Sequence, residues 1–426
     1  MEIPDRIHRL MDKGVAIPNP RDVFIDETVD LERISGQGVT LWPGSRISGV
    51  DTLILPGASI GSQGPMTIDN CQLGPRTELK SGYCSGAVLL ADAQVGANAH
   101  ARGGTILEEG ARTAHSVGLK QTILFPFVTL GSLINFCDVF MAGGTGPKDH
   151  SEVGSSYIHF NFTPNKDKAT ASLVGDVPGG VMLNREPIFL GGQGGLVGPC
   201  RLAYGSVIVA GGICRKDHLR SGQMIFEGGG RNVSIPFTPG VYRGVRRIVA
   251  NNLIYIANLM ALGRWYTHVR SVFSGADGGD LPEPLLQGLK QTLDGAVDER
   301  ICQLARFVEK LKKSLRIIRE SRTGEGQGSL IVQKEEMIQK WDALAHTLAD
   351  LRHGDGDTAL LDQFGSGLIG TVGRDGRNYI DTIGSLEPAL KAVGTQWLES
   401  IVAAVMESAF GVIPIMRPPG KSSYLL

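Results

Sequence analysis

The sequence lacks several features that mark whole classes of protein. Its formal net charge is −1, with 42 Lys and Arg against 43 Asp and Glu, and the basic residues are dispersed. No electrostatic surface for a nucleic-acid backbone is therefore expected. The N-terminus has no apolar segment of the signal-peptide type. The most apolar stretch, 248–262, contains three asparagines and is too short to span a bilayer. We expect neither nucleic acid nor a membrane as a partner.

Cysteine is scarce and unpaired in the sequence. The six cysteines form no CxxC pair and no spacing typical of metal ligands; they are Cys71, Cys84, Cys137, Cys200, Cys214 and Cys302. Isolated thiols in a chain of this size are typical of a reducing compartment, so we expect a cytoplasmic protein. A zinc site built from histidines is not expected, because His150 and His159 lack the close spacing of such sites. The sequence therefore predicts no bound metal.

Glycine, in contrast, is abundant, with 58 residues. Within 188–211 it accompanies aliphatic residues at a fixed interval, since Leu190, Leu196, Leu202 and Ile208 follow one another six positions apart. That interval fits neither a helix nor a pleated strand. It indicates a chain that turns a corner every six residues and directs one aliphatic side chain per side into a central core. Three such sides make one coil of roughly 18 residues.

Aliphatic-Gly pairs also recur from about residue 41 onward, for example at Ile60-Gly61 and Leu130-Gly131. Most of them are not multiples of six apart, so loops must interrupt the coils. Glycine provides the positive φ and the close backbone approach that tight corners need. The alternative, a glycine-rich antiparallel sandwich or barrel, would show alternation with a period of two, which 188–211 lacks.

After Gly240 the apolar pattern changes to that of helices. One apolar stripe covers 245–260, a second runs with three- and four-residue steps over 286–315, and a third covers 337–351. The glycines of Ser321–Ser329 predict a turn between the last two stripes and therefore an antiparallel helical hairpin. A glycine-rich break over Gly354–Gly376 precedes a last helix from about Tyr379 to Phe410.

The segment 188–215 resembles, without a gap, the C-terminal coils of the acetyltransferase domain in the bacterial bifunctional enzymes that acetylate glucosamine 1-phosphate and uridylate the product. The shared features are the phase of the repeat, the LVGP corner at 196–199 and the exit VAGGICRKD at 209–217. Upstream, IHFNFTPNKDKAT at 158–170 is similar to the family segment that holds an Asn-aromatic pair and a Lys. INFCDV at 134–139 is similar to the coil that enters the family's active site. The resemblance covers roughly 124–217.

The resemblance implies a left-handed parallel β-helix, a hand that the six-residue period alone does not determine. We therefore predict a mainly β fold in which the β-helix is followed by an α-helical domain with a long helical hairpin. The expected parts are an N-terminal helix and lead-in over 1–35, a left-handed β-helix of about ten coils over 36–235, and the α-helical domain over 240–426. Prisms of this family usually form trimers with active sites between subunits, so the resemblance also implies a homotrimer.

The chain departs from the family pattern at two places. Between His150 and Asn161 it is shorter by more than half a coil. Phe125 and Phe140 stand where the family has basic residues that bind phosphate. Both departures put glucosamine 1-phosphate in doubt as the acceptor, without excluding acyl transfer to another acceptor.

The chemistry implied is acyl transfer from acetyl-CoA to an amino sugar, a sugar phosphate or a sugar nucleotide. A neutral imidazole is suited to take the proton of the attacking amine or hydroxyl. KDH at 148–150 falls where the family has its catalytic His, so His150 is the candidate base. His115 is the alternative, because a His just before an aliphatic-Gly corner also occurs in related acyltransferases. Asn161 is a third catalytic candidate, at the thioester or acceptor pocket.

The remaining candidates are binding residues. Phe162 would line the acceptor pocket by resemblance, while Lys168 and Lys148 offer cations to an acidic group of the substrate. Small residues leave room for the pantetheine arm, and two basic residues suit the coenzyme A phosphates; these cofactor candidates are Gly192, Gly194, Gly195, Arg215 and Lys216.

Two other functions remain open. The shortened coil and the missing basic residues favour a β-helix that has lost catalysis and serves as a binding or scaffolding module. A sugar nucleotidyltransferase is suggested only by MAGGTGPK at 141–148. A nucleotide-binding loop of that kind should follow a buried strand and open a helix of an α/β domain. Here it lies between expected β-helix coils, which argues against it.

Overall fold

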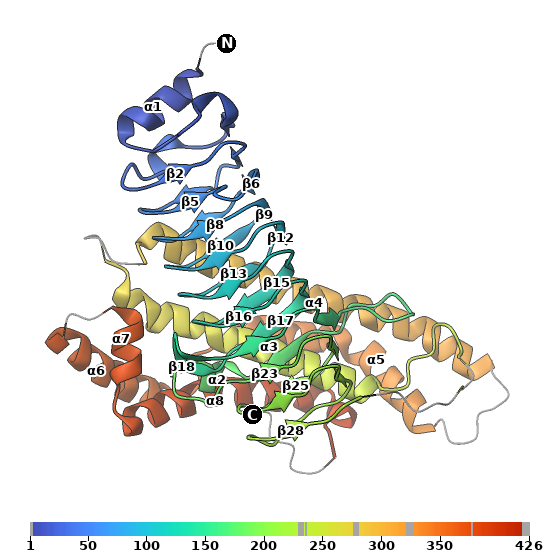
Figure 1. Ribbon diagram of the computed structural model, residues 1–426. Coiled ribbons are helices and arrows are strands. Elements are labelled where there is room, and N and C mark those ends of the chain that lie inside the picture. The colour runs from blue at the N-terminus through green and yellow to red at the C-terminus, as the bar shows by residue number, and fades with distance from the viewer. Residues whose placement is uncertain are drawn as a thin grey trace.

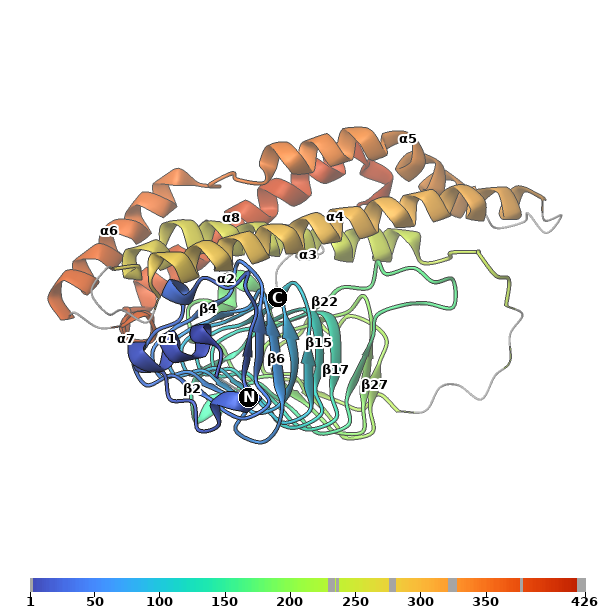
Figure 2. The same ribbon diagram turned by 90° about the horizontal axis from the view of Figure 1, so that it is seen from above.

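The protein is described by a computed structural model that covers residues 3–228, 234, 237–275, 281–320, 328–375 and 378–419, without the side chains of 373–375. A column of short parallel strands makes about 11 turns. Long helices lie along one side of this column (Figure 1), and the view along the column shows them gathered on that side (Figure 2).

The column is a triangular prism, because each turn contributes up to three strands that pair in parallel with those of the neighbouring turns. The open face consists of β1 (Phe24–Ile25), β3 (Arg46–Ser48), β6 (Met66–Asp69), β9 (Gly82–Ser85), β12 (Ala99–Ala101), β21 (Ile158–Phe160), β24 (Gly195–Val197), β27 (Ile213–Cys214) and the first halves of β15 (Gly118–Leu124) and β17 (Asn135–Met141). The helix-covered face consists of β4 (Leu53–Ile54), β7 (Gln72–Leu73), β10 (Ala87–Leu89), β13 (Thr105–Leu107), β22 (Ser172–Val174), β25 (Arg201–Leu202) and the second halves of β15 and β17. The ten-stranded face consists of β2 (Thr40–Leu41), β5 (Ser59–Ile60), β8 (Glu78–Leu79), β11 (Gln94–Val95), β14 (Arg112–Thr113), β16 (Thr129–Leu130), β20 (Glu152–Val153), β23 (Phe189–Leu190), β26 (Val207–Ile208) and β28 (Met224–Ile225).

The six-residue interval sets this geometry. Leu190, Leu196 and Leu202 lie on the three different faces, and Ile208 returns to the first of them and pairs in register with Leu190. All four side chains are fully buried in the column. Each such side chain contributes about 1.5–3 kcal/mol of burial free energy. The predicted left-handed parallel β-helix is therefore confirmed.

Only part of the column keeps the 18-residue turn. Thr113 pairs with Leu130, Leu130 with Val153, and Val153 with Leu190. The extra residues leave the column at its corners as a hairpin of β18 (Gly144–Gly146) and β19 (Asp149–His150), a loop at 161–171, and a segment at 175–188 that contains α2 (Val177–Gly180). These insertions explain why the aliphatic-Gly pairs are irregularly spaced in the sequence.

The short helix η2 (Leu31–Arg33) lies within the first turn of the column. The other helices precede or follow the column; they are α1 (Asp5–Lys13), η1 (Pro20–Asp22), α3 (Val245–His268), η3 (Arg270–Phe273), α4 (Glu283–Glu320), α5 (Gly328–Leu351), α6 (Thr358–Asp375), α7 (Tyr379–Ser385), α8 (Pro388–Val412) and η4 (Pro414–Met416). The predicted hairpin is present, since α4 and α5 pack together. Its predicted turn lies mostly at 321–327, outside the described residues. Among the described residues, no helix is both long and apolar enough to cross a bilayer.

Two details of the predicted helical part are wrong. The expected glycine-rich break at 354–376 contains helix α6, and the expected last helix is divided into α7 and α8. One of the glycines of α6 permits close helix packing: a Cβ on Gly367 would lie 2.7 Å from Leu390 Cδ1 of α8. The division falls just before Pro388, because proline is accepted in the first turn of a helix but not within it.

The asparagines of α3 anchor this helix to the column. α3 is buried on most of its surface. Asn252 donates to the carbonyl of Ala169 at 2.9 Å, and Asn258 accepts from the backbone N–H of Val177 at 2.9 Å. Both partners belong to segments that leave the column, where backbone groups have no strand neighbour. The asparagines therefore satisfy polar groups that would otherwise be buried without a partner.

Buried ion pairs add to this attachment. Arg270 of η3 is fully buried and binds Glu109 with both terminal nitrogens. On α4, Arg300 Nη2 lies 2.8 Å from Asp138 Oδ1 of β17. Burial raises the pKa of Asp138, and the Arg300 guanidinium opposes this shift. Such pairs are costly to break, because the remaining charge stays buried.

Candidate active site

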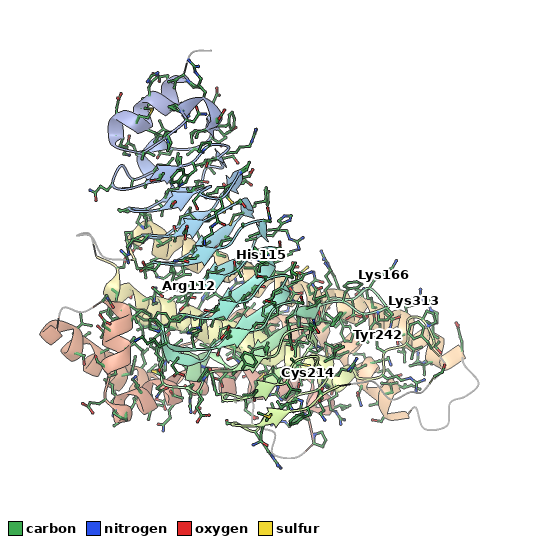
Figure 3. The ribbon with its side chains drawn as sticks, viewed as in Figure 1. Arg112, His115, Lys166, Cys214, Tyr242 and Lys313 are labelled. Carbon is green, nitrogen blue, oxygen red and sulfur yellow. The ribbon has the colours of Figure 1, made fainter. Side chains whose placement is uncertain are left out.

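One edge of the prism points away from the helices. This edge, between the ten-stranded face and the open face, carries His115, Ser132 and Ser155 on three successive turns and Gly192 and Gly194 on the next, and we refer to these five residues as the free edge. His115 Nδ1 lies 2.9 Å from Ser132 Oγ, and the backbone N–H of Ser132 donates to Ser155 Oγ at 3.2 Å. Figure 3 shows His115 on the column. The fold therefore brings His115 onto the same edge as the glycines proposed for the cofactor.

The contact between His115 and Ser132 determines which imidazole nitrogen is available. If Nδ1–H donates to the Ser132 hydroxyl oxygen, then Nε2 carries the free lone pair and can accept a proton. His115 is exposed, so Nε2 is accessible to a ligand. This arrangement can support general-base catalysis.

The glycines of the free edge are explained by packing between turns. A Cβ on Gly192 would lie 2.7 Å from the Ser155 carbonyl oxygen, and one on Gly194 would lie 2.7 Å from the Tyr157 ring. Gly195, at the start of β24, is similarly limited by the Phe160 ring at 2.6 Å. The turns therefore require these glycines with or without a cofactor, and the smooth surface that they leave is available to a ligand.

An open hollow lies on the open face, toward its edge with the helix-covered face, and is lined by Tyr83, Ser85, His100, Arg102 and Gly103, with a volume of about 640 Å³. The Tyr83 and His100 rings meet edge to face with centroids 5.1 Å apart. His100 pairs with Gly118, three residues after His115. A volume of this size suits a small-molecule ligand. No sequence pattern predicts the hollow, because its residues come from separate turns.

The other predicted catalytic residues occupy the two remaining edges. His150 and Lys148 belong to the hairpin of β18 and β19, at the edge between the helix-covered and ten-stranded faces. Lys148 is exposed, and His150 Nδ1 is buried without a hydrogen-bond partner among the residues that the structure describes. Asn161 begins the loop that follows β21, at the edge between the open and helix-covered faces. Within one chain, the fold therefore separates His150, Asn161 and His115 onto three edges.

The environment of Asn161 is that of a structural residue. Its Nδ2 donates to Asp138 Oδ2 at 3.2 Å, and Asp138 is also the partner of Arg300. Phe162 and Lys168 extend from the same loop and are both exposed. The side chain of Asn161 thus helps to hold α4 against the column.

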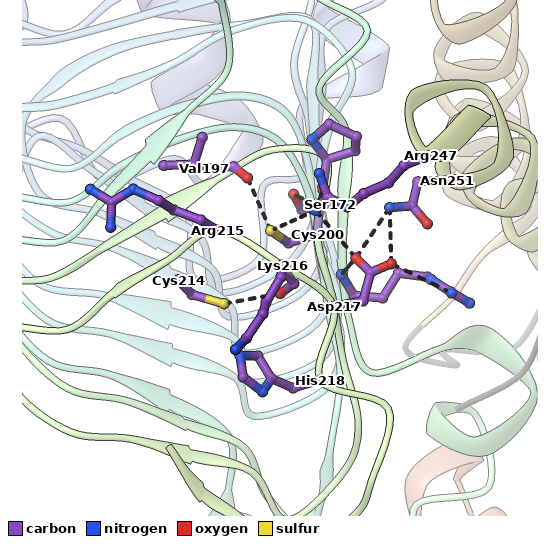
Figure 4. A network of polar contacts seen from close by, with 12 residues as sticks. Ser172, Val197, Cys200, Cys214, Arg215, Lys216, Asp217, His218, Arg247 and Asn251 are labelled. Atoms are coloured by element: carbon purple, nitrogen blue, oxygen red, sulfur yellow. Dashed lines mark hydrogen bonds and ion pairs between the residues drawn. The ribbon is translucent and has the colours of Figure 1, made fainter. Parts of the chain in front are cut away.

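The last predicted residues, Arg215 and Lys216, follow β27 in the final turn. Both are exposed, but Lys216 Nζ lies 3.4 Å from Glu227 Oε1, and the backbone N–H of Arg215 donates to Glu227 Oε2 at 3.0 Å. In Figure 4 the Lys216 side chain runs toward Cys214 and His218, whereas the Arg215 side chain extends away from His218. They lie several turns away from His115.

Sequence reasoning missed the role of His159, which is almost fully buried. Its Nδ1 contacts the Cys137 carbonyl at 2.6 Å and must carry the proton there, so Nε2 accepts from the Ser172 hydroxyl at 2.8 Å. Ser172 in turn accepts from the backbone N–H of Cys200 at 3.0 Å. Burial lowers the pKa of His159 to about 4. This residue is a neutral part of the core, not a catalytic group.

Comparison with known proteins places these features in context. No protein-family model matches the chain. Similar curated proteins are the Bifunctional protein GlmU of Thermotoga maritima, 24% identical over 213 residues, and that of Pelobacter propionicus, 29% identical over 214 residues. Each match covers 50% of this chain and 41–42% of the relative, and the matched region is the acetyltransferase region of GlmU. The chain therefore spans less than half the length of these relatives.

The chain is similar to the hexapeptide-repeat acyltransferases. Within this similarity, Phe125 and Phe140 explain one departure from the family pattern. Both rings are fully buried and meet edge to face with centroids 4.7 Å apart. These positions therefore belong to the core and cannot contact a phosphate, unlike the basic residues expected there in a hexapeptide-repeat acyltransferase.

Proposed function

We propose that the protein is a coenzyme A-dependent acyltransferase that uses acetyl-CoA and acts on an amino sugar, a sugar phosphate or a sugar nucleotide. The observation that carries the proposal is the free edge: His115, with its partner Ser132, lies on the same edge as a glycine-lined surface, and the adjoining open face has a hollow that suits a small ligand. The similarity to the acetyltransferase region of GlmU supports the same reaction class.

In this mechanism the acceptor occupies the open hollow. The sugar ring packs against Tyr83 and His100, and Arg102 meets a phosphate of the acceptor. The pantetheine arm lies along Gly192 and Gly194, so that the thioester at its end reaches His115. As the acceptor nitrogen or oxygen attacks the thioester carbonyl, His115 Nε2 takes its proton. The carbon–sulfur bond then breaks, and coenzyme A leaves as the thiol after receiving that proton.

A trimer completes the proposal. The helices occupy one face of the prism, so the open and ten-stranded faces remain for contacts between copies. The free edge lies between these two faces. A neighbouring subunit there would supply the second wall of a cofactor groove, and residues such as Lys168 or His150 could reach that groove from another chain. We place the enzyme in the cytoplasm on the basis of its unpaired cysteines.

The first test is binding of acetyl-CoA in a thermal-shift experiment. A ligand present at about a hundred times its Kd stabilises the folded protein by about 2.7 kcal/mol. The expected result is a clear, concentration-dependent rise in Tm with acetyl-CoA and little change with an equal concentration of adenosine. The absence of a shift with any acyl-CoA would rule out the acyltransferase.

The second test identifies the base through thiol release with a panel of amino sugars and sugar nucleotides. His115→Ala is expected to lower kcat by about 100-fold or more, in the range typical of general-base catalysis. His346→Ala, an exposed position on α5, is the matched control and should retain full activity. If His150→Ala abolishes activity while His115→Ala does not, the base is His150 and the free edge has another role.

The second candidate function is a binding or scaffolding module without catalysis. The observation that favours it is that the free-edge glycines and Asn161 are fully explained by packing and by contacts with Asp138. Retained acetyl-CoA binding with no thiol release for any acceptor would favour this candidate.

A further inference from the structure

Three side chains of different chemistry converge in the final turn of the column. Cys214 lies at the end of β27, His218 follows the next corner, and Glu227 follows β28. One ligand atom from each lies within 4.8 Å of the other two, and His218 Nε2 is 3.0 Å from Glu227 Oε1. Figure 4 shows the Cys214 sulfur and the His218 ring on either side of Lys216.

The donor set and its spacing suit a tetrahedral metal ion. Zn²⁺ binds thiolate sulfur at about 2.3 Å and imidazole nitrogen or carboxylate oxygen at about 2.0–2.2 Å, so neighbouring donors lie roughly 3.4–3.7 Å apart. The observed atoms need to move by only about an ångström to reach that arrangement. A mixture of sulfur, nitrogen and oxygen favours a borderline-soft ion such as Zn²⁺ over Mg²⁺ or Ca²⁺.

The segment that carries His218 is already fixed in place. Its neighbour Asp217 accepts from the backbone N–H of Arg201 at 3.1 Å and from Asn251 Nδ2 of α3, also at 3.1 Å. Arg247 Nη2 lies 3.4 Å from the same carboxylate. These contacts, drawn in Figure 4, tie the corner to both the column and the helices. Little conformational entropy would therefore be lost on metal binding.

Glu227 is held from two sides as well. Its carbonyl accepts from the backbone N–H of Ile213 at 2.8 Å, and its Oε2 accepts from the backbone N–H of Arg215 at 3.0 Å. These are the donors that a further β-helix turn would otherwise satisfy. The carboxylate therefore covers the open end of the ladder and leaves Oε1 facing His218 and Lys216 Nζ, which a bound metal ion would displace from Oε1.

The Cys214 thiol donates to the Lys216 carbonyl oxygen. The thiolate is the form in which cysteine binds metals. Metal binding would therefore release the Cys214 proton and replace the 3.3 Å contact between its sulfur and the Lys216 carbonyl.

We propose that Cys214, His218 and Glu227 bind one Zn²⁺-class ion, with solvent as the fourth ligand, and that the ion closes the last turn of the β-helix. The proposal is independent of acyl transfer. The sequence pattern did not predict it, because the donors are separated by three and eight residues and match no familiar spacing. The fold brings them together through one corner and one short strand.

The test uses the full chain, purified with a chelator and kept under a phosphine reductant so that Cys200 and Cys214 stay reduced. Zn²⁺ is added and counted after gel filtration, and Co²⁺ is added as a spectroscopic probe. The expected result is one bound Zn²⁺ per chain, a thiolate-to-cobalt absorption band, and a Tm that rises with Zn²⁺ and falls again with chelator.

Variants assign the ligands. His218→Gln and Glu227→Gln are only partly buried and should fold; each is expected to weaken Zn²⁺ binding by at least about 10- to 100-fold, the loss seen even for residues that merely support ligands. Cys214→Ser should also remove the cobalt band. Cys302→Ser and His346→Ala, exposed positions elsewhere in the chain, are the matched controls and should bind as the wild type does.

Several outcomes would overturn the proposal. These are less than about one-tenth of an equivalent of Zn²⁺ under reductant, a cobalt spectrum without a thiolate band, or unchanged affinity in both His218→Gln and Glu227→Gln. Loss of binding in the two control variants to the same extent would likewise show nonspecific uptake.

Discussion

The helix-covered face and the free edge of the same column differ in how their polar groups are arranged. On the helix-covered face, polar groups are buried and each is matched to a helix: Glu109 to Arg270, Asp138 to Arg300, and the Ala169 carbonyl to Asn252. On the free edge, the polar contacts of His115 and Ser132 are exposed and run between neighbouring turns of the column. The first arrangement is suited to stability, whereas the second leaves reactive atoms accessible.

This contrast predicts that changes on the covered side affect folding, while changes on the free edge affect activity. The largest effect is expected for Arg270→Ala. It leaves the Glu109 carboxylate buried without its partner and removes the guanidinium that stacks 3.7 Å from the centre of the Tyr379 ring. We expect a loss of about 3–5 kcal/mol in the free energy of unfolding, measured by urea denaturation.

The control for this variant is Lys312→Ala on α4. It removes an exposed ion pair in which Lys312 Nζ lies 2.6 Å from Glu309 Oε1. Exposed pairs of this kind contribute about 1 kcal/mol or less. Equal losses in the two variants would mean that the buried pair does not hold the helices to the column.

A smaller effect is expected for Gly367→Ala. The added Cβ would lie 2.7 Å from Leu390 Cδ1 and force α6 away from α8, which should cost about 1–3 kcal/mol. Gly370→Ala in the same helix meets no atom within 4 Å, so it should instead stabilise the protein by about 0.5–1 kcal/mol. Urea denaturation of Gly367→Ala and Gly370→Ala tests whether the two changes in stability have opposite signs. Two variants of equal stability would contradict the close contact between α6 and α8 at Gly367.

The pH dependence of stability tests the buried carboxylates. Glu108 accepts from the Tyr266 hydroxyl at 2.5 Å, and burial raises the pKa of Glu108 to about 7 from a usual value of 4.5. The unfolded chain therefore releases this proton at lower pH than the folded protein does. Stability from this residue is present below about pH 4.5 and is lost as the pH rises to about 7.

Glu108→Gln should consequently gain stability relative to the wild type on going from pH 5 to pH 8, as measured by urea midpoints at both values. Glu152→Gln, an exposed position on β20, is the control for loss of a carboxylate. An effect of Glu108→Gln that is the same at both pH values would contradict the raised pKa.

The smallest effect on stability is expected for Ser132→Ala on the free edge. The hydroxyl is exposed, so the free energy of unfolding should change by about 0.5 kcal/mol or less. If His115 is the base, kcat should fall because the imidazole loses the partner that fixes its tautomer, while KM changes little. A large loss of stability with unchanged kcat would show that Ser132 contributes to folding and not to activity, contrary to the contrast drawn above.

The fold was predictable where local rules act alone. The interval from Leu190 to Ile208 predicts the prism because every corner there is regular. The helices of the hairpin were predictable from their apolar stripes, as in Leu304 and Leu311. Helix α6 was not, because its glycines suggest a break, whereas one of them, Gly367, is instead explained by close contact with α8. Tertiary packing there overrides helix propensity.

The candidate site was predictable only in its residue types. His115 and Ser132 are 17 residues apart and occupy equivalent positions on adjacent turns, because the turn that joins them has 17 residues and not the regular 18. The hairpin that carries His150 and the loop that carries Asn161 leave the column at different corners, and no sequence spacing encodes that difference. Likewise, nothing local marks the partners of Arg300 or of the Cys214 group.

Helix α4 touches the column at three separate heights. Gly288 lies directly against the side chain of Gln72, Arg300 meets Asp138, and Lys310 donates to the carbonyls of Asn165 and Lys166. These three contacts lie at fixed distances along α4, so the number of residues between them on the helix must match the number of column turns between their partners. Insertion or deletion of a whole turn between β7 and β22 would disrupt all later matches at once. In relatives that keep this helix, we therefore expect the number of turns to vary in the N-terminal part of the column, which α4 does not contact.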